Sequence, residues 1–233
     1  MKAKGKGGPM VHLTEKFGAA FEYAAIVHAA QRRKGTDIPY VSHLLGVAAL
    51  VLENGGDEEA AIAALLHDAP EDQGGEARLE DIRVRFGERV ADIVRQCSDS
   101  LSADAKAKGP WPDRKREYIW HLGTSSDRGA LLVACADKLH NARAILQDHR
   151  QVKGRVWERF TGNGEKTPEM ILGFYGALAE AFAKRLPGRL SDELQLTVGQ
   201  LVAESGLTPD RGWVRVACDG NQEGKMAPRR RWT

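Results

Sequence analysis

The most informative part of this chain is the segment AAIAALLHDAPEDQ, which occupies residues 60–73. Its first seven residues are apolar, and no uninterrupted apolar run in the chain is longer. A helix that is apolar on every side is a buried helix. His67 and Asp68 follow this run directly, yet a buried charge is costly unless it is paired or bound to a metal ion. The segment therefore predicts a buried helix that ends at a functional site.

A second segment repeats this pattern. Residues 131–143 read LLVACADKLHNAR, so Asp137 follows a run made of Leu, Val, Ala and Cys. The surrounding periodicity predicts one long helix over residues 127–149. Asp137 is a second carboxylate placed where an apolar side chain is expected, and it has the same need for a partner.

The rest of the chain has helical periodicity too, without the alternation typical of strands and without internal repeats. Ser42 and Asp57 are expected to cap the helices that begin after them. The predicted fold class is all-α: a helical bundle of about ten helices, with connections of about 2–12 residues. It forms a single domain over residues 15–205, between a disordered basic arm (1–14) and a basic, flexible tail (206–233).

Composition excludes several classes of protein. The 233 residues are 42% hydrophobic, which is enough for a core, and the formal net charge is +2. The excess positive charge lies at the two ends of the chain, so the body has no broad basic surface for nucleic acid. Three widely spaced cysteines without a CxxC motif disfavour both a disulfide framework and a thiolate zinc site. No apolar run approaches the ~20 residues that span a bilayer. A soluble protein of the reducing cytoplasm is expected.

Four residues form a candidate metal site: His43, His67, Asp68 and Asp137. The His67–Asp68 dipeptide alone is equally compatible with a helix C-terminus, where histidine complements the helix dipole. Together the four supply two imidazoles and two carboxylates without sulfur. Such a mixed set suits Mn²⁺ or Fe²⁺ better than Zn²⁺ or Mg²⁺, and it leaves coordination positions for water and substrate.

The order of these residues is similar to the H…HD…D pattern of the HD phosphohydrolase superfamily. The wider text resembles the alarmone hydrolases, which comprise the hydrolase domain of RelA/SpoT-type proteins and the stand-alone small alarmone hydrolases. The resemblance covers residues 17–150 closely and continues more loosely to about 186. Its motifs are QRRKGTDIPYVSH (31–43), ALLHDAPEDQ (64–73), FGERVADIVRQCSD (86–99) and ADKLHNAR (136–143).

The resemblance implies a catalytic centre built on one divalent ion, usually Mn²⁺, held by the four residues of the candidate metal site. It also implies that Glu71 and Asp72 position the attacking water and assist proton transfer. Without the neighbouring motif, this acidic pair would be interpreted as a solvated loop. Pro70 departs from the family pattern, in which an aliphatic residue is usual, and it is expected to end the preceding helix early.

The resemblance further implies a nucleotide site. Arg33 and Lys34, which follow Arg32, flank the base, while Lys138 and Asn141 contact phosphate and nucleotide. From charge alone, the basic run 32–34 is equally compatible with a solvated helix end. His140 is expected to be a core or surface histidine rather than a fifth ligand, and Tyr40 is expected to pack rather than react.

The implied activity is metal-dependent hydrolysis of the 3′-pyrophosphate of an alarmone nucleotide, (p)ppGpp or (p)ppApp, with release of pyrophosphate by a stand-alone hydrolase. The substrate is a small nucleotide, no nucleic-acid or membrane partner is expected, and an oligomer is possible. The residues do not decide between guanine and adenine or between tetra- and pentaphosphate. Two alternatives remain: another HD-type nucleotide phosphohydrolase (a 5′-nucleotidase or a nucleoside triphosphohydrolase), and a catalytically weak alarmone-binding protein.

Overall fold

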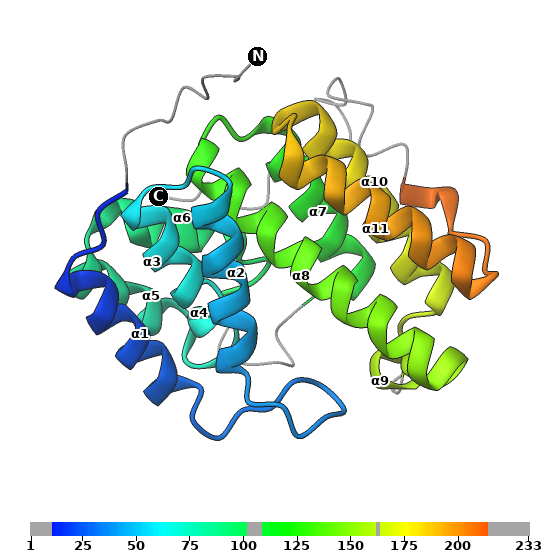
Figure 1. Cartoon of the computed structure of the whole chain (residues 1–233), viewed down its shortest axis with the longest axis horizontal. Helices are drawn as coiled ribbons and strands as arrows, with labels where there is room; N and C mark the ends of the chain where they lie inside the picture. Colours follow the sequence, from blue (N-terminus) through cyan, green and yellow to red (C-terminus); the bar gives the residue numbers. More distant parts are fainter. Residues whose placement is uncertain (1–10, 102–108, 162–163, 214–233) are drawn as a thin grey trace, which may run out of the picture.

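The computed structural model describes residues 11–101, 109–161 and 164–213 (Figure 1). Within these ranges the chain is helical, without strands, and its one isolated bridge pairs Arg32 with Pro39. The all-α prediction is therefore confirmed. The α-helices of the described ranges are α1 Glu15–Val27, α2 Val41–Glu53, α3 Glu58–Leu66, α4 Ala69–Asp72, α5 Gly75–Phe86, α6 Glu88–Cys97, α7 Trp111–Thr124, α8 Arg128–Val152, α9 Glu158–Thr161, α10 Pro168–Arg185 and α11 Arg189–Ser205. Two 3₁₀ turns, η2 Lys153–Trp157 and η3 Arg211–Trp213, complete them.

Helix α3 is the centre of the N-terminal part. All seven residues from 60 to 66 are buried, four of them alanines, and the helix packs against α1, α2, α6 and α8. Four small alanine side chains allow these neighbours to approach closely on every side. The apolar run of the sequence has thus become the most enclosed helix of the described structure.

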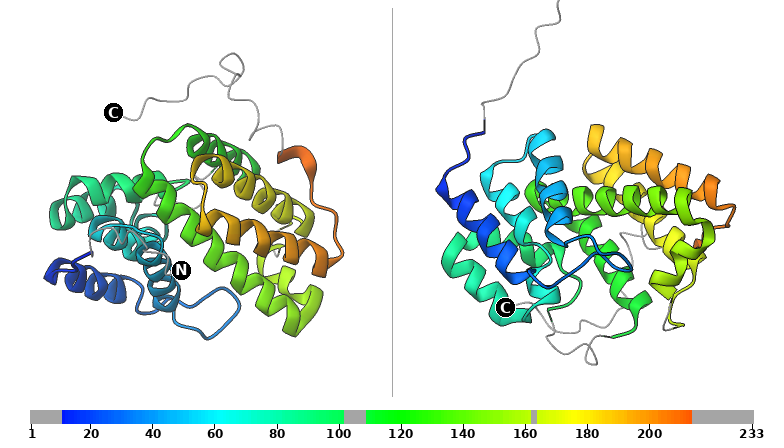
Figure 2. Two further views of the ribbon diagram at one scale, coloured as in Figure 1. Left: turned by 45° about the horizontal axis from the view of Figure 1, so that its top comes forward. Right: turned by 60° about the horizontal axis from the view of Figure 1, so that its bottom comes forward.

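Helix α8 connects the two parts of the bundle. Its 25 residues pack against α2, α3 and α6 near its start and against α10 and α11 further along. Figure 1 shows it crossing the middle of the molecule, and both views of Figure 2 show α10 and α11 beside it. A residue of α8 that faces α2 and α3 therefore lies inside the bundle.

Local sequence explains how α3 begins and ends. Asp57 caps it as expected, because its Oδ1 accepts a hydrogen bond from the amide of Ala60 at 2.9 Å. Pro70 does not belong to α3, which ends at Leu66; it lies in the first turn of α4, where a missing N–H is tolerated. The expected cap at Ser42 is wrong, since α2 begins at Val41 and its N-terminus has no side-chain cap.

Packed structure continues beyond residue 205. Trp213 is only 1% exposed, and its ring lies 5.4 Å from that of Trp111 and 5.7 Å from that of Phe174. Gly173 of α10 permits this contact, because a Cβ there would lie 2.2 Å from the carbonyl oxygen of Asp210. The expected arm and tail otherwise fall on residues 1–10 and 214–233, outside the described ranges. None of the helices in those ranges is long and apolar enough to cross a membrane.

Candidate active site

The four predicted metal ligands come together from three parts of the chain. His43 lies in the first turn of α2, His67 and Asp68 lie between α3 and α4, and Asp137 lies in α8. His43 Nε2 is 3.2 Å from Asp137 Oδ1 and 3.6 Å from Asp68 Oδ2. His67 Nε2 is 3.0 Å from Asp68 Oδ2 and 3.7 Å from Asp137 Oδ1. One atom of each side chain thus faces a common point.

The two imidazoles have the chemistry of metal ligands. His43 and His67 are 0% and 2% exposed, and the Nε2 atom of each is buried without a hydrogen-bond partner. The other nitrogen of each ring is engaged: His67 Nδ1 donates to the carbonyl oxygen of Ala64 at 2.8 Å, and His43 Nδ1 lies 2.9 Å from His140 Nδ1. A histidine held in this way presents an Nε2 lone pair to a metal. The donor set therefore fits a divalent ion, as expected of an HD domain.

The negative charge of Asp68 and Asp137 is stabilised by Lys138 and by the two imidazoles of the candidate metal site. Burial alone would raise the pKa of Asp137, but Lys138 and the two imidazoles hold it well below its usual range. Burial also opposes ionisation of Asp68, whose pKa is held low by His67 and His43. Burial would lower the pKa of His67, yet the two carboxylates raise it. Binding of a cation here therefore releases a proton.

Three further side chains hold the carboxylates in place. Tyr40 donates from Oη to Asp68 Oδ2 at 2.6 Å. Lys138 Nζ lies 2.6 Å from Asp137 Oδ2, and Asn141 Nδ2 donates to Asp137 Oδ1 at 2.5 Å. Lys138 and Asn141, the predicted substrate contacts, therefore also contact a metal ligand. Tyr40 therefore not only packs but also donates a hydrogen bond to a candidate metal ligand. The position of Tyr40, three residues before His43, is the feature of the sequence that could have indicated this contact.

The predicted acidic pair lies on α4, immediately after the metal ligands. Asp72 is exposed, and its Oδ2 accepts a hydrogen bond from Gln31 Nε2 at 2.7 Å. Glu71 makes a hydrogen bond with the carboxyl group of Asp99. Helix α4 begins directly after Asp68, and the amide of Asp72 donates to the carbonyl oxygen of Asp68 at 3.0 Å, so the acidic pair stays close to this candidate ligand along the backbone.

Asp99 is a buried partner that sequence reasoning did not select. Its side chain is 2% exposed, and it contacts Lys115 and Arg114, the latter at 2.7 Å. Burial would raise the pKa of Asp99, but these two cations lower it to about 2. Asp99 therefore stays ionised at neutral pH, between Lys115 and Arg114. The signal in the sequence was the place of Asp99 at the end of the motif FGERVADIVRQCSD (86–99).

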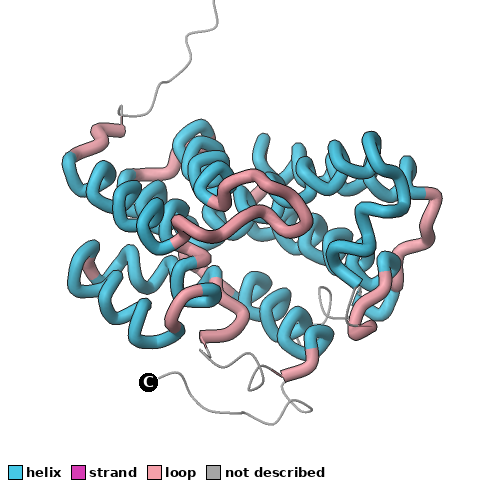
Figure 3. Tube along the Cα trace, turned by 90° about the horizontal axis from the view of Figure 1, so that it is seen from below, coloured by secondary structure: helices cyan, strands magenta, loops and turns pink. Residues whose placement is uncertain are grey.

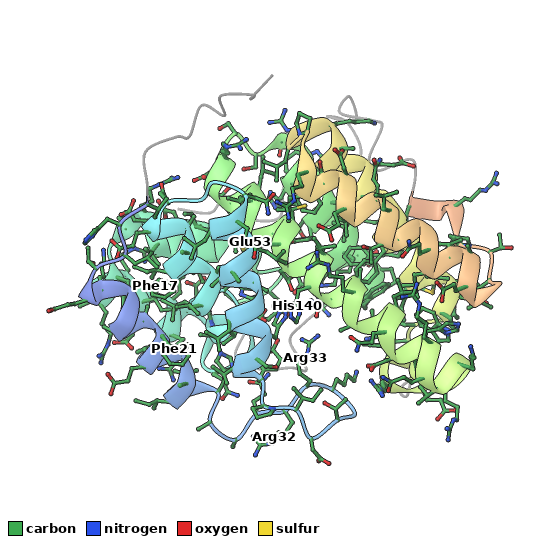
Figure 4. All side chains as sticks on the ribbon, in the orientation of Figure 1. Phe17, Phe21, Arg32, Arg33, Glu53 and His140 are labelled. Carbon is green, nitrogen blue, oxygen red and sulfur yellow. The ribbon has the colours of Figure 1, made fainter. Side chains whose placement is uncertain are left out.

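The basic residues of the loop between α1 and α2 divide into two groups. Arg33 faces the site: its Nη2 donates to Asn141 Oδ1 at 2.7 Å, and its guanidinium carbon lies 5.8 Å from the centre of the Tyr40 ring. Lys34 is exposed, with Nζ 5.8 Å from the centre of the Phe160 ring. Arg32 instead donates to carbonyl oxygens of its own segment, those of Ala29 and Gln31. Figure 4 shows Arg33 near His140 and Arg32 further out.

This loop forms a shallow depression beside the metal site, lined by residues 32–37. The loop itself lies at the bottom of the molecule in Figure 1 and faces the viewer in Figure 3. A ligand in this depression would meet Arg33 and Lys34, and Arg33 in turn contacts Asn141.

Comparison with known proteins identifies relatives with this arrangement. The HD domain family model matches residues 20–161. The guanosine-3′,5′-bis(diphosphate) 3′-pyrophosphohydrolase MESH1 of Drosophila melanogaster is 38% identical over 133 residues, which are 56% of this chain and 69% of that protein. MESH1 of Mus musculus is 32% identical over 192 residues, 81% of this chain and 94% of that protein. An Aquifex aeolicus enzyme of the same name is 37% identical over 131 residues, but the match spans only 18% of its length.

Solved structures agree with these matches. A metazoan ortholog of SpoT, described as hydrolysing ppGpp, superposes with a TM-score of 0.60 at 30% identity and covers 84% of this chain and 99% of its own. A Listeria monocytogenes protein superposes with a TM-score of 0.57 at 26% identity, covering 69% of this chain and 99% of its own. The family-model match, the sequence identities and the shared fold agree, and the chain belongs to the HD-domain family, among the small alarmone hydrolases.

Proposed function

We propose that this chain is a metal-dependent 3′-pyrophosphohydrolase of alarmone nucleotides. The observation that carries the proposal is the convergence of two unpartnered imidazole nitrogens and two carboxylate oxygens beside an acidic pair. The curated relatives that share these motifs are named for hydrolysis of guanosine-3′,5′-bis(diphosphate).

In the proposed site, His43, His67, Asp68 and Asp137 hold one Mn²⁺ ion. Mixed nitrogen and oxygen donors without sulfur favour Mn²⁺ or Fe²⁺ over Zn²⁺, and these four leave positions for water and substrate. When bound, such an ion activates water for attack and polarises the scissile phosphate. Asp137 keeps its orientation through Lys138 and Asn141, and Asp68 through Tyr40.

Glu71 and Asp72 are the proposed acid/base pair. Water attacks the phosphorus next to the ribose, the bond from that phosphorus to O3′ breaks, and O3′ takes a proton as pyrophosphate leaves. Asp72, held by Gln31, orients the water, and Glu71 assists proton transfer.

The nucleotide is proposed to lie along the loop between α1 and α2. Arg33 and Lys34 contact the base, with Arg32 in the outer part of the loop, and Lys138 and Asn141 contact phosphate. Both guanosine and adenosine alarmones are proposed as substrates, because these side chains give no basis for preferring guanine over adenine. The proposed compartment is the cytoplasm.

A product assay separates this function from its rivals. The protein is incubated with Mn²⁺ and either a 3′-pyrophosphorylated nucleotide or an ordinary 5′-monophosphate, and the products are separated by chromatography. Intact pyrophosphate and a nucleotide with a free 3′-hydroxyl are expected. Monophosphate released from the 5′-nucleotide, without action on the 3′-pyrophosphate, would identify a 5′-nucleotidase instead. Binding without turnover would identify an alarmone-binding protein.

A further inference from the structure

The loop between α1 and α2 is closed at its base beside the acidic pair. The amide of Tyr40 donates to the carbonyl oxygen of Gln31 at 3.0 Å, and the amide of Arg33 donates to that of Ile38 at 2.8 Å. These two bonds fix the backbone of Gln31 between α1 and α2. Its side chain reaches across to α4, 41 positions later in the sequence, and contacts Asp72.

The side-chain amide of Gln31 contacts Asp72, His28 and Gln73, whose Nε2 donates to Gln31 Oε1 at 3.4 Å, and one orientation satisfies all three. Nε2 donates to Asp72 Oδ2 at 2.7 Å, and Oε1 lies 2.6 Å from His28 Nδ1. An ionised carboxylate only accepts hydrogen bonds, so the NH₂ group must face Asp72. The oxygen then faces His28, whose Nδ1–H donates to it.

His28 fixes this orientation because it is itself immobilised. Its side chain is buried, 2% exposed, and its ring stacks on that of Tyr40 with centres 5.2 Å apart and planes 26° from parallel. Tyr40 is in turn held by its hydrogen bond to Asp68. If the Gln31 amide were flipped, its NH₂ group would face the N–H of His28 and its oxygen would face the Asp72 carboxylate. Both contacts would then be repulsive.

We propose that Gln31, oriented by His28, is a positioning residue that holds the Asp72 carboxylate in the plane from which it acts on the attacking water. The proposal rests on the function proposed above. Asp72 is exposed on a helix of four residues, which does little to restrict its rotamers. The hydrogen bond from Gln31 fixes the direction of the Oδ2 atom, as partners of catalytic groups commonly do.

The test is a double-mutant cycle between Gln31 and Asp72, measured as kcat and KM for a 3′-pyrophosphorylated nucleotide with Mn²⁺. Gln31→Leu keeps the volume of the side chain and removes its hydrogen bonds with Asp72, His28 and Gln73. It is expected to lower kcat about tenfold, with KM and bound metal unchanged. In an Asp72→Ala background, the same substitution is expected to change kcat by less than about twofold, because no carboxylate remains to be held.

A second variant tests the role of His28 without touching the amide. His28→Phe keeps a ring against Tyr40 but removes the N–H that faces Gln31. A smaller fall in kcat is expected, and none when Gln31 is already Leu. Gln195→Leu, an exposed glutamine on α11, is the matched control and should leave both constants unchanged.

The outcomes separate this inference from the proposed function. If Gln31→Leu lowers kcat by the same factor with and without the Asp72 carboxylate, Gln31 supports the fold rather than Asp72, and the positioning role is wrong. Unchanged kcat in Gln31→Leu also overturns it. If the unmodified protein releases no pyrophosphate from any 3′-pyrophosphorylated nucleotide, the proposed function fails before any variant is compared.

Discussion

Arg33 donates a hydrogen bond from Nη2 to Oδ1 of Asn141 at 2.7 Å, across 108 positions of the chain. Asn141 passes the contact on, because its Nδ2 donates to Asp137 Oδ1. The side-chain amide of Asn141 thus links Arg33, in the loop between α1 and α2, to Asp137, a proposed metal ligand. Only a side chain with both an acceptor and a donor can make this link. Asn141 therefore couples the positions of Arg33 and Asp137 through two hydrogen bonds.

Arg33→Ala, or charge reversal at Lys34, should weaken binding of an alarmone nucleotide. Loss of a hydrogen bond to a charged group is expected to raise KM for a 3′-pyrophosphorylated nucleotide about tenfold or more. KM for a small generic phosphoester should change little, since such a substrate does not reach the loop. Arg128→Ala, an exposed arginine at the start of α8, is the control. Equal effects on both substrates would remove the loop from the nucleotide site.

His67→Ala or Asp68→Ala should abolish both bound metal and activity. An open site that keeps only three of its four protein ligands holds its ion poorly. The buried Nε2 of His43 is then left without a bound ion to contact. Metal content of the purified variants is measured by elemental analysis, together with turnover. His121→Ala replaces a half-exposed histidine on α7 and should retain both. Full activity with stoichiometric metal in either ligand variant would refute the site.

Glu71→Gln or Asp72→Asn should separate catalysis from metal binding. Each change keeps the size of the side chain but removes a proton acceptor, so activity is expected to fall by about 10²-fold or more. Metal content should stay near that of the unmodified protein, since neither residue belongs to the four-ligand set. Parallel loss of metal and activity would show that these acids are ligands or structural residues.

Asp99 should make folding stability depend on acidity. Its pKa is about 2 in the folded chain against 3.8 ordinarily, so its stabilising effect is fully present above pH 4 and is lost as the pH falls towards 2. The shift corresponds to about 2 kcal/mol of unfolding free energy at neutral pH. Urea unfolding between pH 7 and 2 should show that Asp99→Asn is less stable at pH 7 and loses less stability on acidification. The same slope in both proteins would exclude Asp99 as its source.

Much of this arrangement is predictable from sequence, since apolar runs of seven residues mark α3 and α8. Charged residues placed directly after or within such runs mark the metal ligands, because a carboxylate buried there must be paired or bound to a cation. Hydrophobic periodicity does not report side-chain bonds between distant segments. The hydrogen-bonded residues Tyr40 and Asp68 are 28 positions apart in the sequence, and Gln31 and Asp72 are 41 positions apart. Tertiary packing alone brings the members of each pair together.

Smaller features depend on backbone details that propensities leave open. Ser42 is a favourable capping residue, yet α2 begins before it, so its hydroxyl lies inside the first turn. Trp213 follows a stretch typical of a flexible tail, and it is buried because Gly173 leaves room for the chain to approach α10. Neither outcome is encoded within a few residues of the position concerned.

The burial of α3 has an evolutionary consequence. In a helix with seven consecutive buried residues, a larger or polar side chain at any of these positions lowers the stability of the fold. His67 and Asp68, which follow this helix directly, are therefore constrained by packing as well as by chemistry. The loop of residues 28–40 is under no such constraint over its exposed tip. Substitutions at the exposed tip of the loop should therefore be tolerated more readily than substitutions within α3.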